Sequence, residues 1–378
     1  MKEYIRREGK LLRCGVTTGT CAAAAAGAAV RVLLGAQPPA EIQVSLPGGG
    51  CARLTVSLVW KTQEEACCAV KKDAGDDPDI TDGTEIRARV SLRSGSGVHI
   101  EGGRGVGRVT KPGLDQPVGA AAINSVPRAM IEREALRACR EAGYTGGLSV
   151  TVEIPQGEEL AKKTFNPHMG IVGGLSVLGT SGIVEPMSEQ ALVGTIRAEV
   201  SLRAASGRRY LAAVPGNYGE RFAQEQLHLP RGLAVTCSNY IGEVIDLASE
   251  YGFRGVLLVG HIGKLCKLGA GLMNTHSRFG DARMEILSAC AVEAGAQGDT
   301  LRQVLSCVTA DEALNTLERA EVLEGSLQAL ARRAEFYLNK RAGDGIAAEA
   351  LIFSQKRGLL CGTAGAQALL SAVKGETV

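Results

Sequence analysis

The sequence has few aromatic residues, no excess of charge and no long apolar run, and each lack excludes a class of protein. Phe, Trp and Tyr make up 4% of the 378 residues, too few for the aromatic platforms that hold single-stranded nucleic acid. The formal net charge of +2 gives no reason to expect a nucleic-acid or anionic-membrane partner. No apolar run approaches the roughly 18 residues of a membrane-spanning helix, and the charged start MKEYIRREGK lacks a signal-peptide core. We therefore expect a cytoplasmic protein.

Paired cysteines and clustered histidines are also missing. The 11 cysteines are scattered without a C-x-x-C pair, which is typical of reduced thiols rather than of a disulfide framework or a zinc site. The five histidines contain no H-x₃₋₅-H pair. We predict no metal site built by the protein itself.

Glycine is abundant, with 49 residues, and two styles of sequence meet near residue 190. Residues 1–190 read as an α+β domain with glycine-rich loops that face the substrate. Helices are predicted at about 19–34 and 126–142, and strands at 41–46, 52–60, 65–72, 85–92 and 148–154. Residues 191–378 alternate apolar strands (209–214, 233–238, 254–260 and 349–354) with helices, and 281–341 is mostly helical. We predict an α/β fold whose second domain is a doubly wound, mostly parallel, Rossmann-like sheet with a helical C-terminal part.

Short glycine-bearing turns follow the predicted strands of the second domain. Pro215–Gly219, Ser238–Asn239 and Gly260–Lys264 would gather at the carboxyl ends of parallel strands, where such sheets bind ligands. The turn GHIGK (260–264) is too short for a phosphate-binding P-loop, and Leu265 stands where that motif needs a hydroxyl. His261 in this turn either satisfies the local backbone or lines a ligand site, and the sequence leaves both open.

The segment GGRGVGR (102–108) resembles a nucleotide-binding glycine loop only superficially. Pro112 would break the helix that such a loop needs at its end. We predict a flexible hairpin that presents Arg104, Arg108 and Lys111, either as a solvated basic turn or to bind carboxylates.

Seven motifs then occur in order along the chain. They are GVTTGTCAAAAAGAA, GRGVGRVTKPGL, AAINSVPRAMI, PQGEELAKKTFNPHMGIVGGLSVLGTSGIVEPMSEQAL, PGNYG, SNYIGEVIDLA and LLVGHIGKLCKLGAGLMNTHSRFGDARMEIL. Together they resemble the cobalt-precorrin-5B (C-1)-methyltransferase family of anaerobic cobalamin biosynthesis. The resemblance runs from about residue 12 to about residue 287, and GLLCGTAGAQALL (358–370) extends it into the tail. Gly27 stands where the family often has a basic residue, so we expect no cation at that position of the first helix.

This resemblance implies transfer of a methyl group from S-adenosylmethionine to ring carbon C-1 of cobalt-precorrin-5B, giving cobalt-precorrin-6A. Cobalt would arrive within the corrinoid substrate. Neither the family nor this sequence carries a standard methyltransferase fingerprint, so the donor follows from the resemblance alone. The resemblance leaves open a hand-over of the corrinoid to other enzymes of the pathway and a homo-oligomer.

Candidate site residues follow from matching this reaction to the sequence. A general base that raises electron density at C-1 is expected among His276, His261, Asp281 and Glu185, in that order. Asp281 has a second interpretation, as the N-cap or a first-turn acid of the following helix. The donor is expected at the strand-end turns: Gly216, Asn217, Tyr218, Gly219, Ser238, Asn239 and Gly260. The substrate carboxylates are expected at Thr17, Thr18, Thr20, Arg104, Arg108, Lys111, Arg128, Lys264 and Arg278.

The first helix also has a structural interpretation. Thr17, Thr18 or Thr20 can cap a helix that the alanines from Ala22 to Ala26 favour, and its free N–H groups would attract a carboxylate. The alanine face would pack closely against either the sheet or the macrocycle, and we favour the sheet.

Two other functions remain open at this point. A non-catalytic carrier would bind the corrinoid without binding the methyl donor. A phosphotransferase built on GHIGK would need ATP, but the sequence lacks the hydroxyl and the acidic magnesium-binding motif of such enzymes.

Overall fold

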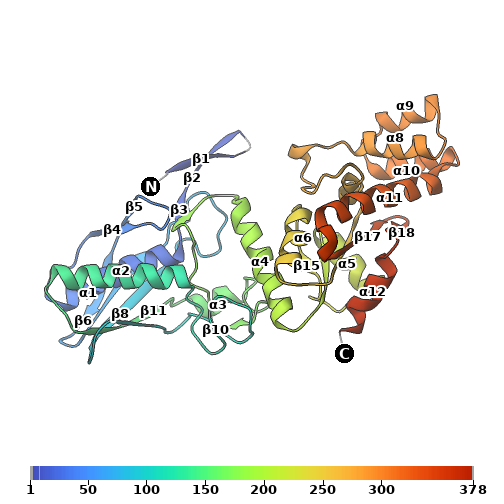
Figure 1. The fold of residues 1–378 in the computed structure, drawn as a ribbon. Coiled ribbons are helices and arrows are strands. Elements are labelled where there is room, and N and C mark those ends of the chain that lie inside the picture. Colours follow the sequence, from blue (N-terminus) through green and yellow to red (C-terminus); the bar gives the residue numbers. More distant parts are fainter. Residues whose placement is uncertain (1–2, 8, 377–378) are drawn as a thin grey trace. The chain divides into compact units, whose positions relative to one another are not determined.

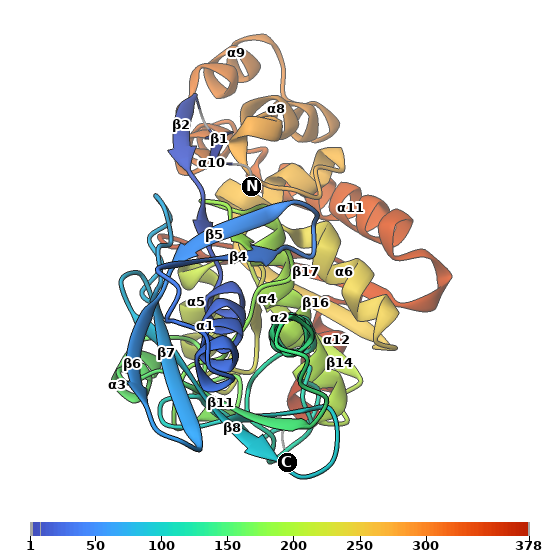
Figure 2. The same cartoon turned by 90° about the vertical axis from the view of Figure 1, so that its left-hand side faces the viewer.

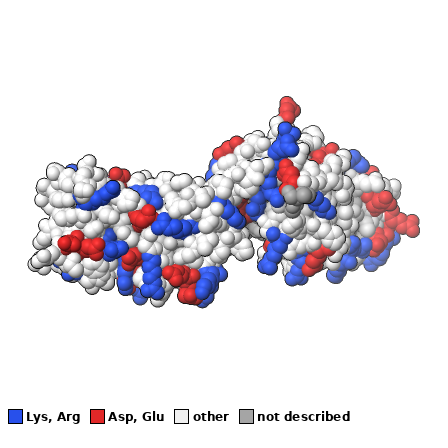
Figure 3. Space-filling model, turned by 90° about the horizontal axis from the view of Figure 1, so that it is seen from below, with Lys and Arg blue, Asp and Glu red and all other residues white. Residues whose placement is uncertain are grey.

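The chain divides into two units, Met1–Glu189 and Gln190–Val378. The computed structural model describes residues 3–7 and 9–376. Each unit contains its own sheet and its own buried apolar core. In the space-filling view of Figure 3, basic and acidic side chains are interspersed over the face drawn. No helix in the described parts of the chain combines the length and the apolar character needed to cross a membrane.

A five-stranded sheet with the order β6-β7-β8-β11-β9 organises the first unit. Its strands are β6 (Ser57–Lys61), β7 (Glu65–Lys71), β8 (Glu85–Arg93), β9 (Val98–Gly102) and β11 (Gly147–Glu153). All neighbours are antiparallel except β9 and β11, which are parallel. Four two-stranded ladders accompany it: β1 (Tyr4–Arg7) with β2 (Lys10–Arg13), β3 (Gly15–Val16) with β13 (Ile183–Val184), β4 (Glu41–Ser45) with β5 (Cys51–Thr55), and β10 (Arg108–Val109) with β12 (Ile171–Val172).

Two long helices, α1 (Thr18–Leu33) and α2 (Ser125–Glu141), lie side by side on one face of this sheet (Figures 1 and 2). The alanines from Ala22 to Ala26 are fully buried, and α1 contacts α2, β7 and β8. Small side chains allow this close approach of helix to helix and of helix to sheet. The expected packing of the alanine face on the sheet is therefore confirmed. A short helix, α3 (Gly157–Ala161), follows β11.

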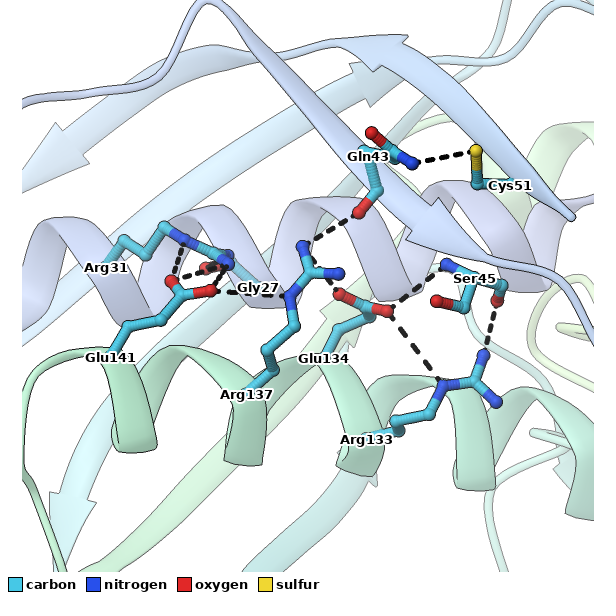
Figure 4. Close-up of polar contacts among 9 residues, drawn as sticks. All are labelled: Gly27, Arg31, Gln43, Ser45, Cys51, Arg133, Glu134, Arg137 and Glu141. Atoms are coloured by element: carbon cyan, nitrogen blue, oxygen red, sulfur yellow. Dashed lines mark hydrogen bonds and ion pairs between the residues drawn. The ribbon is translucent and has the colours of Figure 1, made fainter.

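A buried carboxylate, Glu134 on α2, joins α1, α2 and β4 (Figure 4). Its Oε2 lies 3.2 Å from Nη2 of Arg137, and its Oε1 accepts a hydrogen bond from the Ser45 N–H at 3.4 Å. Gly27 of α1 faces this cluster, because a Cβ there would lie 3.3 Å from Cβ of Glu134 and 3.3 Å from Nη1 of Arg31. Position 27 thus lies inside a helix–helix interface.

Two local predictions for the first unit are wrong. The single strand expected at 52–60 is divided between β5 and β6, which pair with different neighbours on either side of the buried Val56. The hairpin expected at 102–108 does not form, because β9 pairs with β11 whereas β10 pairs with β12. The intervening loop crosses another segment at backbone contact: a Cβ on Gly105, whose φ is +73°, would lie 1.9 Å from the carbonyl oxygen of Ile154. Its glycines therefore serve a close crossing of two chain segments.

The second unit contains a five-stranded sheet with the order β15-β14-β16-β17-β18. Its strands are β14 (Tyr210–Val214), β15 (Val235–Thr236), β16 (Gly255–His261), β17 (Ala347–Ser354) and β18 (Gly358–Gly362). The first four strands are parallel and β18 is antiparallel to β17. The expected Rossmann-like, mostly parallel sheet is confirmed. When its strands are numbered along the chain, their order across the sheet is 2-1-3-4-5, as in flavodoxin-like folds.

Helices cover both faces of this second sheet. The helices that follow β13 along the chain are α4 (Glu189–Ala205), α5 (Asn217–Glu225), α6 (Ile241–Glu250), α7 (Ile262–Leu265), α8 (Arg283–Glu293), α9 (Gly298–Ser306), α10 (Ala310–Arg319), α11 (Leu323–Ala342) and α12 (Ala366–Gly375). Among them, α8 and α9 pack on other helices rather than on the sheet. Along β16, Val256 and Leu258 join the core that contains α6 and α11, whereas Leu257 and Val259 join the core that contains α5 and α12. This alternation is what a strand buried on both faces produces. The sequence did not lead us to expect β18 or α12.

Candidate functional site

A pocket of about 770 Å³ opens in the second unit, within the size range of small-molecule sites. Its lining comes from the turns that follow two neighbouring parallel strands, β14 and β16: Pro215, Gly216, Asn217, Tyr218, Gly219, Arg221, His261, Gly263 and Lys264. In the chain these are the first and third strands of the sheet, so their turns diverge to helices on opposite faces. A crevice forms at such a switch point, and ligands of doubly wound sheets bind there.

The turn after β14 presents the start of α5 to this pocket. Gly216 is the N-cap residue with a φ of 127°, a conformation that a side chain would strain. A Cβ on Gly219 would lie 2.7 Å from the carbonyl oxygen of Val259, so glycine lets α5 approach β16 closely. The backbone N–H groups of the first turn of α5 and its dipole favour a negatively charged group.

His261 ends β16 and borders the pocket. Its Nδ1 accepts a hydrogen bond of 3.1 Å from the Gly263 N–H and so caps α7, and its Nε2 lies 3.9 Å from Oδ2 of Asp311. Burial lowers the pKa of His261 below its usual 6.5, and Asp311 partly opposes this shift. With Nδ1 accepting, the neutral ring carries its proton on Nε2. In this arrangement His261 is a hydrogen-bond donor and has no free lone pair.

Lys264 ties the strand-end turns together. Its Nζ donates to the carbonyl oxygen of Pro215 at 2.7 Å and to that of Ser238 at 3.5 Å. These carbonyls follow β14 and β15, and Lys264 itself follows β16. Burial lowers the pKa of this half-buried ammonium group. Lys264 therefore contributes both positive charge and order to the rim of the pocket.

Comparison with known proteins gives this geometry its context. The family model described as CbiD matches residues 5–186, and the model described as CbiD, C-terminal domain, matches residues 274–364. The cobalt-precorrin-5B C(1)-methyltransferase of Ruminiclostridium cellulolyticum is 46% identical over 94% of this chain and 92% of its own length. The chain belongs to the CbiD family. Its predicted family resemblance is thereby confirmed.

Further members of the CbiD family show comparable similarity. The proteins of the same name from a Thermoanaerobacter species and from Alkaliphilus metalliredigens are 42% and 38% identical, over 95% and 100% of this chain and 98% and 99% of their own lengths. A crystal structure of the cobalamin biosynthesis protein cbiD from Archaeoglobus fulgidus is 28% identical, covers 74% of this chain and 88% of its own, and superposes with a TM-score of 0.41.

The other predicted donor residues of this CbiD chain lie next to the pocket lining rather than in it. Ser238 supplies the carbonyl that Lys264 binds. Asn239 accepts a hydrogen bond of 3.2 Å from the Thr275 hydroxyl, and Gly260 packs against Leu265. The structure thus brings Gly216–Gly219 together with His261 and Lys264 and uses the remaining three residues as supports.

The segment that carries His276 is held in place by a buried lysine. Lys267, in the 3₁₀ helix η1 (Cys266–Ala270), is 3% exposed and donates to the carbonyls of Thr275 at 3.1 Å and Gly280 at 3.0 Å. His276 caps the 3₁₀ helix η2 (Ser277–Phe279), because its Nδ1 accepts a hydrogen bond of 3.2 Å from the Arg278 N–H. Like His261, it carries its proton on Nε2 in the neutral form.

Two further predicted residues lie in this segment. The guanidinium of Arg278 stacks on the Phe279 ring, 4.7 Å from its centroid. The N-cap interpretation of Asp281 is wrong, because Ala282 occupies the N-cap of α8 with a φ of 45°. Asp281 instead binds Arg283 in an ion pair, and that hydrogen-bonded pair lowers the pKa of its carboxyl group. A lowered pKa makes Asp281 a weaker base.

The predicted site residues of the first unit differ in how many hydrogen bonds and ion pairs their side chains already make within the chain. The Arg128 guanidinium donates to three carbonyls, those of Ile123, Ile100 and Ala121. Arg108 lies 3.2 Å from Glu101, Lys111 donates to the His168 carbonyl at 3.4 Å, and Glu185 lies 3.6 Å from Arg7. The Arg104 side chain is exposed and makes no hydrogen bond or ion pair within residues 3–7 and 9–376, whereas its backbone carbonyl accepts a hydrogen bond of 2.9 Å from the Ile154 N–H. Its guanidinium therefore keeps its hydrogen-bond donors for a ligand.

The threonine turn at the start of α1 is buried and hydrogen-bonded to other parts of the chain. Thr17 is the N-cap and accepts a hydrogen bond from the Thr20 N–H at 3.2 Å, which confirms that a threonine caps this helix. Thr20 in turn donates to the Gly182 carbonyl at 2.7 Å. Thr17, Thr18 and Thr20 are all buried. A role of these residues in substrate binding stays a prediction.

Sequence reasoning missed two residues of the pocket region. Arg221 lines the pocket from α5, four residues after Asn217 and so on the same helix face. That spacing in NYGER was a signal that could have revealed it. Asp311, the partner of His261, lies fifty residues away in the chain and no local pattern points to it. Among the described residues no group of three or more His, Cys, Asp or Glu side chains could hold a metal ion.

Proposed function

We propose that this CbiD-family chain is a C-methyltransferase that transfers a methyl group from S-adenosylmethionine to ring carbon C-1 of cobalt-precorrin-5B, giving cobalt-precorrin-6A. The observation that carries this proposal is the shared name of its relatives. Proteins called cobalt-precorrin-5B C(1)-methyltransferase are 38% to 46% identical to it over at least 94% of its length. Cobalt belongs to the substrate in this reaction.

The pocket at the β14–β16 switch point is our candidate for the donor. An adenosyl ligand fits the volume of about 770 Å³, the exposed Tyr218 offers an aromatic surface, and the start of α5 favours the carboxylate of the methionine part. The pocket has the position that nucleotide ligands take in doubly wound sheets. Binding of S-adenosylhomocysteine to this pocket tests the assignment.

The chain's own contribution to catalysis is alignment and proton handling. Methyl transfer needs the nucleophilic ring carbon in line with the sulfonium, and fixed positions supply much of the rate. We propose Arg104 as a contact for a substrate carboxylate, because the structure leaves its guanidinium free. His276 and His261 remain the proposed proton-handling groups, and each acts first as an Nε2–H donor.

Calorimetry with S-adenosylhomocysteine and a methyl-transfer assay with cobalt-precorrin-5B test the proposal. We expect the chain to bind S-adenosylhomocysteine, the product left by the donor, and to methylate the corrinoid. Corrinoid binding without donor binding would instead indicate a carrier that hands the intermediate to another enzyme. If His276→Ala and His261→Ala both retain near-full turnover, neither histidine handles a proton in the reaction.

A further inference from the structure

The pocket at the switch point carries an unusual balance of charge. Three of its lining residues are basic, Arg221, His261 and Lys264, and none is acidic. The first turn of α5 adds partial positive charge from its backbone N–H groups. A pocket of this composition favours a ligand with a negatively charged group.

The three basic side chains differ in how many hydrogen-bond donors remain available to a ligand. The Lys264 ammonium already donates to two backbone carbonyls, and burial lowers its pKa. His261 uses Nδ1 as a helix cap, and burial lowers its pKa, which favours the neutral ring. The Arg221 side chain is exposed and makes no hydrogen bond or ion pair with the described part of the chain. Its guanidinium therefore keeps its donors for a ligand.

The position of Arg221 suits a ligand held at the start of α5. It follows Asn217 by four residues, so both lie on the helix face that lines the pocket. Helical side chains point back toward the helix N-terminus, which directs a long side chain at 221 along the first turn. A planar guanidinium there can bind both oxygens of a carboxylate, with the N–H groups of the turn beside it.

We propose that Arg221 is the residue that recognises a ligand carboxylate in this pocket. The assignment rests on the proposed function, which supplies two carboxylate sources: the methionine part of the donor, and the acetate and propionate side chains of the corrinoid. The interaction is a bidentate ion pair and forms no covalent bond. The recognition chemistry is the same for both sources, and binding experiments distinguish them.

Four probes in calorimetry separate the sources. S-adenosylhomocysteine carries the methionine-type carboxylate, and 5′-methylthioadenosine has the same nucleoside and thioether without it. Cobyrinic acid is a corrinoid with free side-chain carboxylates, and its methyl ester lacks them. Each is titrated into the full chain as wild type, Arg221→Gln, Arg221→Lys and the control Arg231→Gln, an exposed arginine outside the pocket lining. Circular dichroism confirms that every variant is folded.

We expect Arg221→Gln to weaken binding of one carboxylate probe by about tenfold to a hundredfold, the usual effect of a lost charged hydrogen bond. Binding of the matched probe without the carboxylate is expected to stay unchanged, Arg221→Lys to lie between, and Arg231→Gln to match wild type. Loss confined to S-adenosylhomocysteine assigns the donor carboxylate, and loss confined to cobyrinic acid assigns the substrate carboxylate.

Two results overturn the assignment of Arg221 while leaving the proposed function standing. The first is wild-type affinity of Arg221→Gln for both carboxylate probes. The second is an equal loss for a carboxylate probe and its carboxylate-free partner, which would mean that the variant disturbs the pocket in general. A wild-type chain that binds neither S-adenosylhomocysteine nor cobyrinic acid overturns both proposals.

Discussion

Glu199 on α4 makes the stability of the second unit depend on pH. Its side chain is buried, and its Oε2 accepts a hydrogen bond of 3.4 Å from the Thr236 N–H. Burial raises the pKa of this carboxyl group from 4.5 to about 7. The Thr236 N–H and Arg203 oppose the shift, and Glu220 adds to it. The burial cost of the charged form dominates.

The sign of the effect follows from proton binding. The folded state holds a proton on Glu199 more tightly than the unfolded state does, so its contribution to stability is fully present below pH 4.5. That contribution is lost as the pH rises through about 7. A shift from 4.5 to about 7 corresponds to ~3 kcal/mol in the free energy of unfolding, as an upper estimate.

Glu199→Gln isolates this contribution. The amide keeps an oxygen acceptor for the Thr236 N–H but does not titrate. Urea unfolding followed by circular dichroism, repeated between about pH 5 and 8, gives the difference between wild type and variant. We expect that difference to move by ~2.5 kcal/mol in favour of the variant over this range, because part of the contribution is already lost at pH 5. Glu225→Gln, an exposed acid on α5, is the matched control and should give a flat difference.

Parallel stability curves for wild type and Glu199→Gln would refute this reasoning. They would mean that the carboxylate is solvated or paired well enough to stay charged in the folded state. An additional pH-independent offset does not matter as long as the difference between the two curves also changes with pH, because the offset reports only the different packing of the amide.

Three other predictions concern the close packing of the chain. Gly105→Ala should prevent folding of the first unit, because its Cβ would meet a carbonyl oxygen at 1.9 Å. The control Gly95→Ala lies in open space at a φ of +88° and should lower the free energy of unfolding by only about 1–2 kcal/mol. Similar thermal unfolding of the two variants would contradict this prediction. Lys267→Met leaves the carbonyls of Thr275 and Gly280 without their buried donor and should cost about 2–3 kcal/mol in urea unfolding. Lys340→Met, at an exposed position, should change little. Burial raises the pKa of the Cys21 thiol to about 12, so at pH 8 it should resist alkylation while the half-buried Cys51 and Cys307 are labelled, as mass spectrometry would show. Rapid modification of Cys21 in the native chain would argue against the burial.

Local sequence patterns predicted most of the regular elements that position the site. Predictions held where residues from Ala22 to Ala26 favour a helix, and where strand-like runs end in glycine turns such as Pro215–Gly219. Capping and β-propensity act over a few residues, so they can be read along the chain. The mostly parallel second sheet could be predicted because apolar strands that alternate with helices are compatible with only a few sheet topologies.

The errors arose where a long-range contact decides the local conformation. The residues 102–108 read as a flexible hairpin, but contact with the backbone of Ile154 sets their path. The strand expected at 52–60 is divided because its two halves pair with different partners. Asp281 was expected to cap a helix and instead pairs with Arg283. Each partner is invisible to a rule that considers neighbouring residues only.

The sequence by itself determined the family, the mostly parallel second sheet and the turns at which a ligand can bind, because motif order and binary pattern are written in consecutive residues. Only the tertiary structure decided which charged groups are available at those turns. In the folded chain Lys264 binds two backbone carbonyls, and His261 and His276 each cap a short helix. The Arg221 side chain makes no hydrogen bond or ion pair with the described residues. Hydrogen bonds between groups far apart in the chain consume donors and lone pairs, and this loss appears only once the chain is folded.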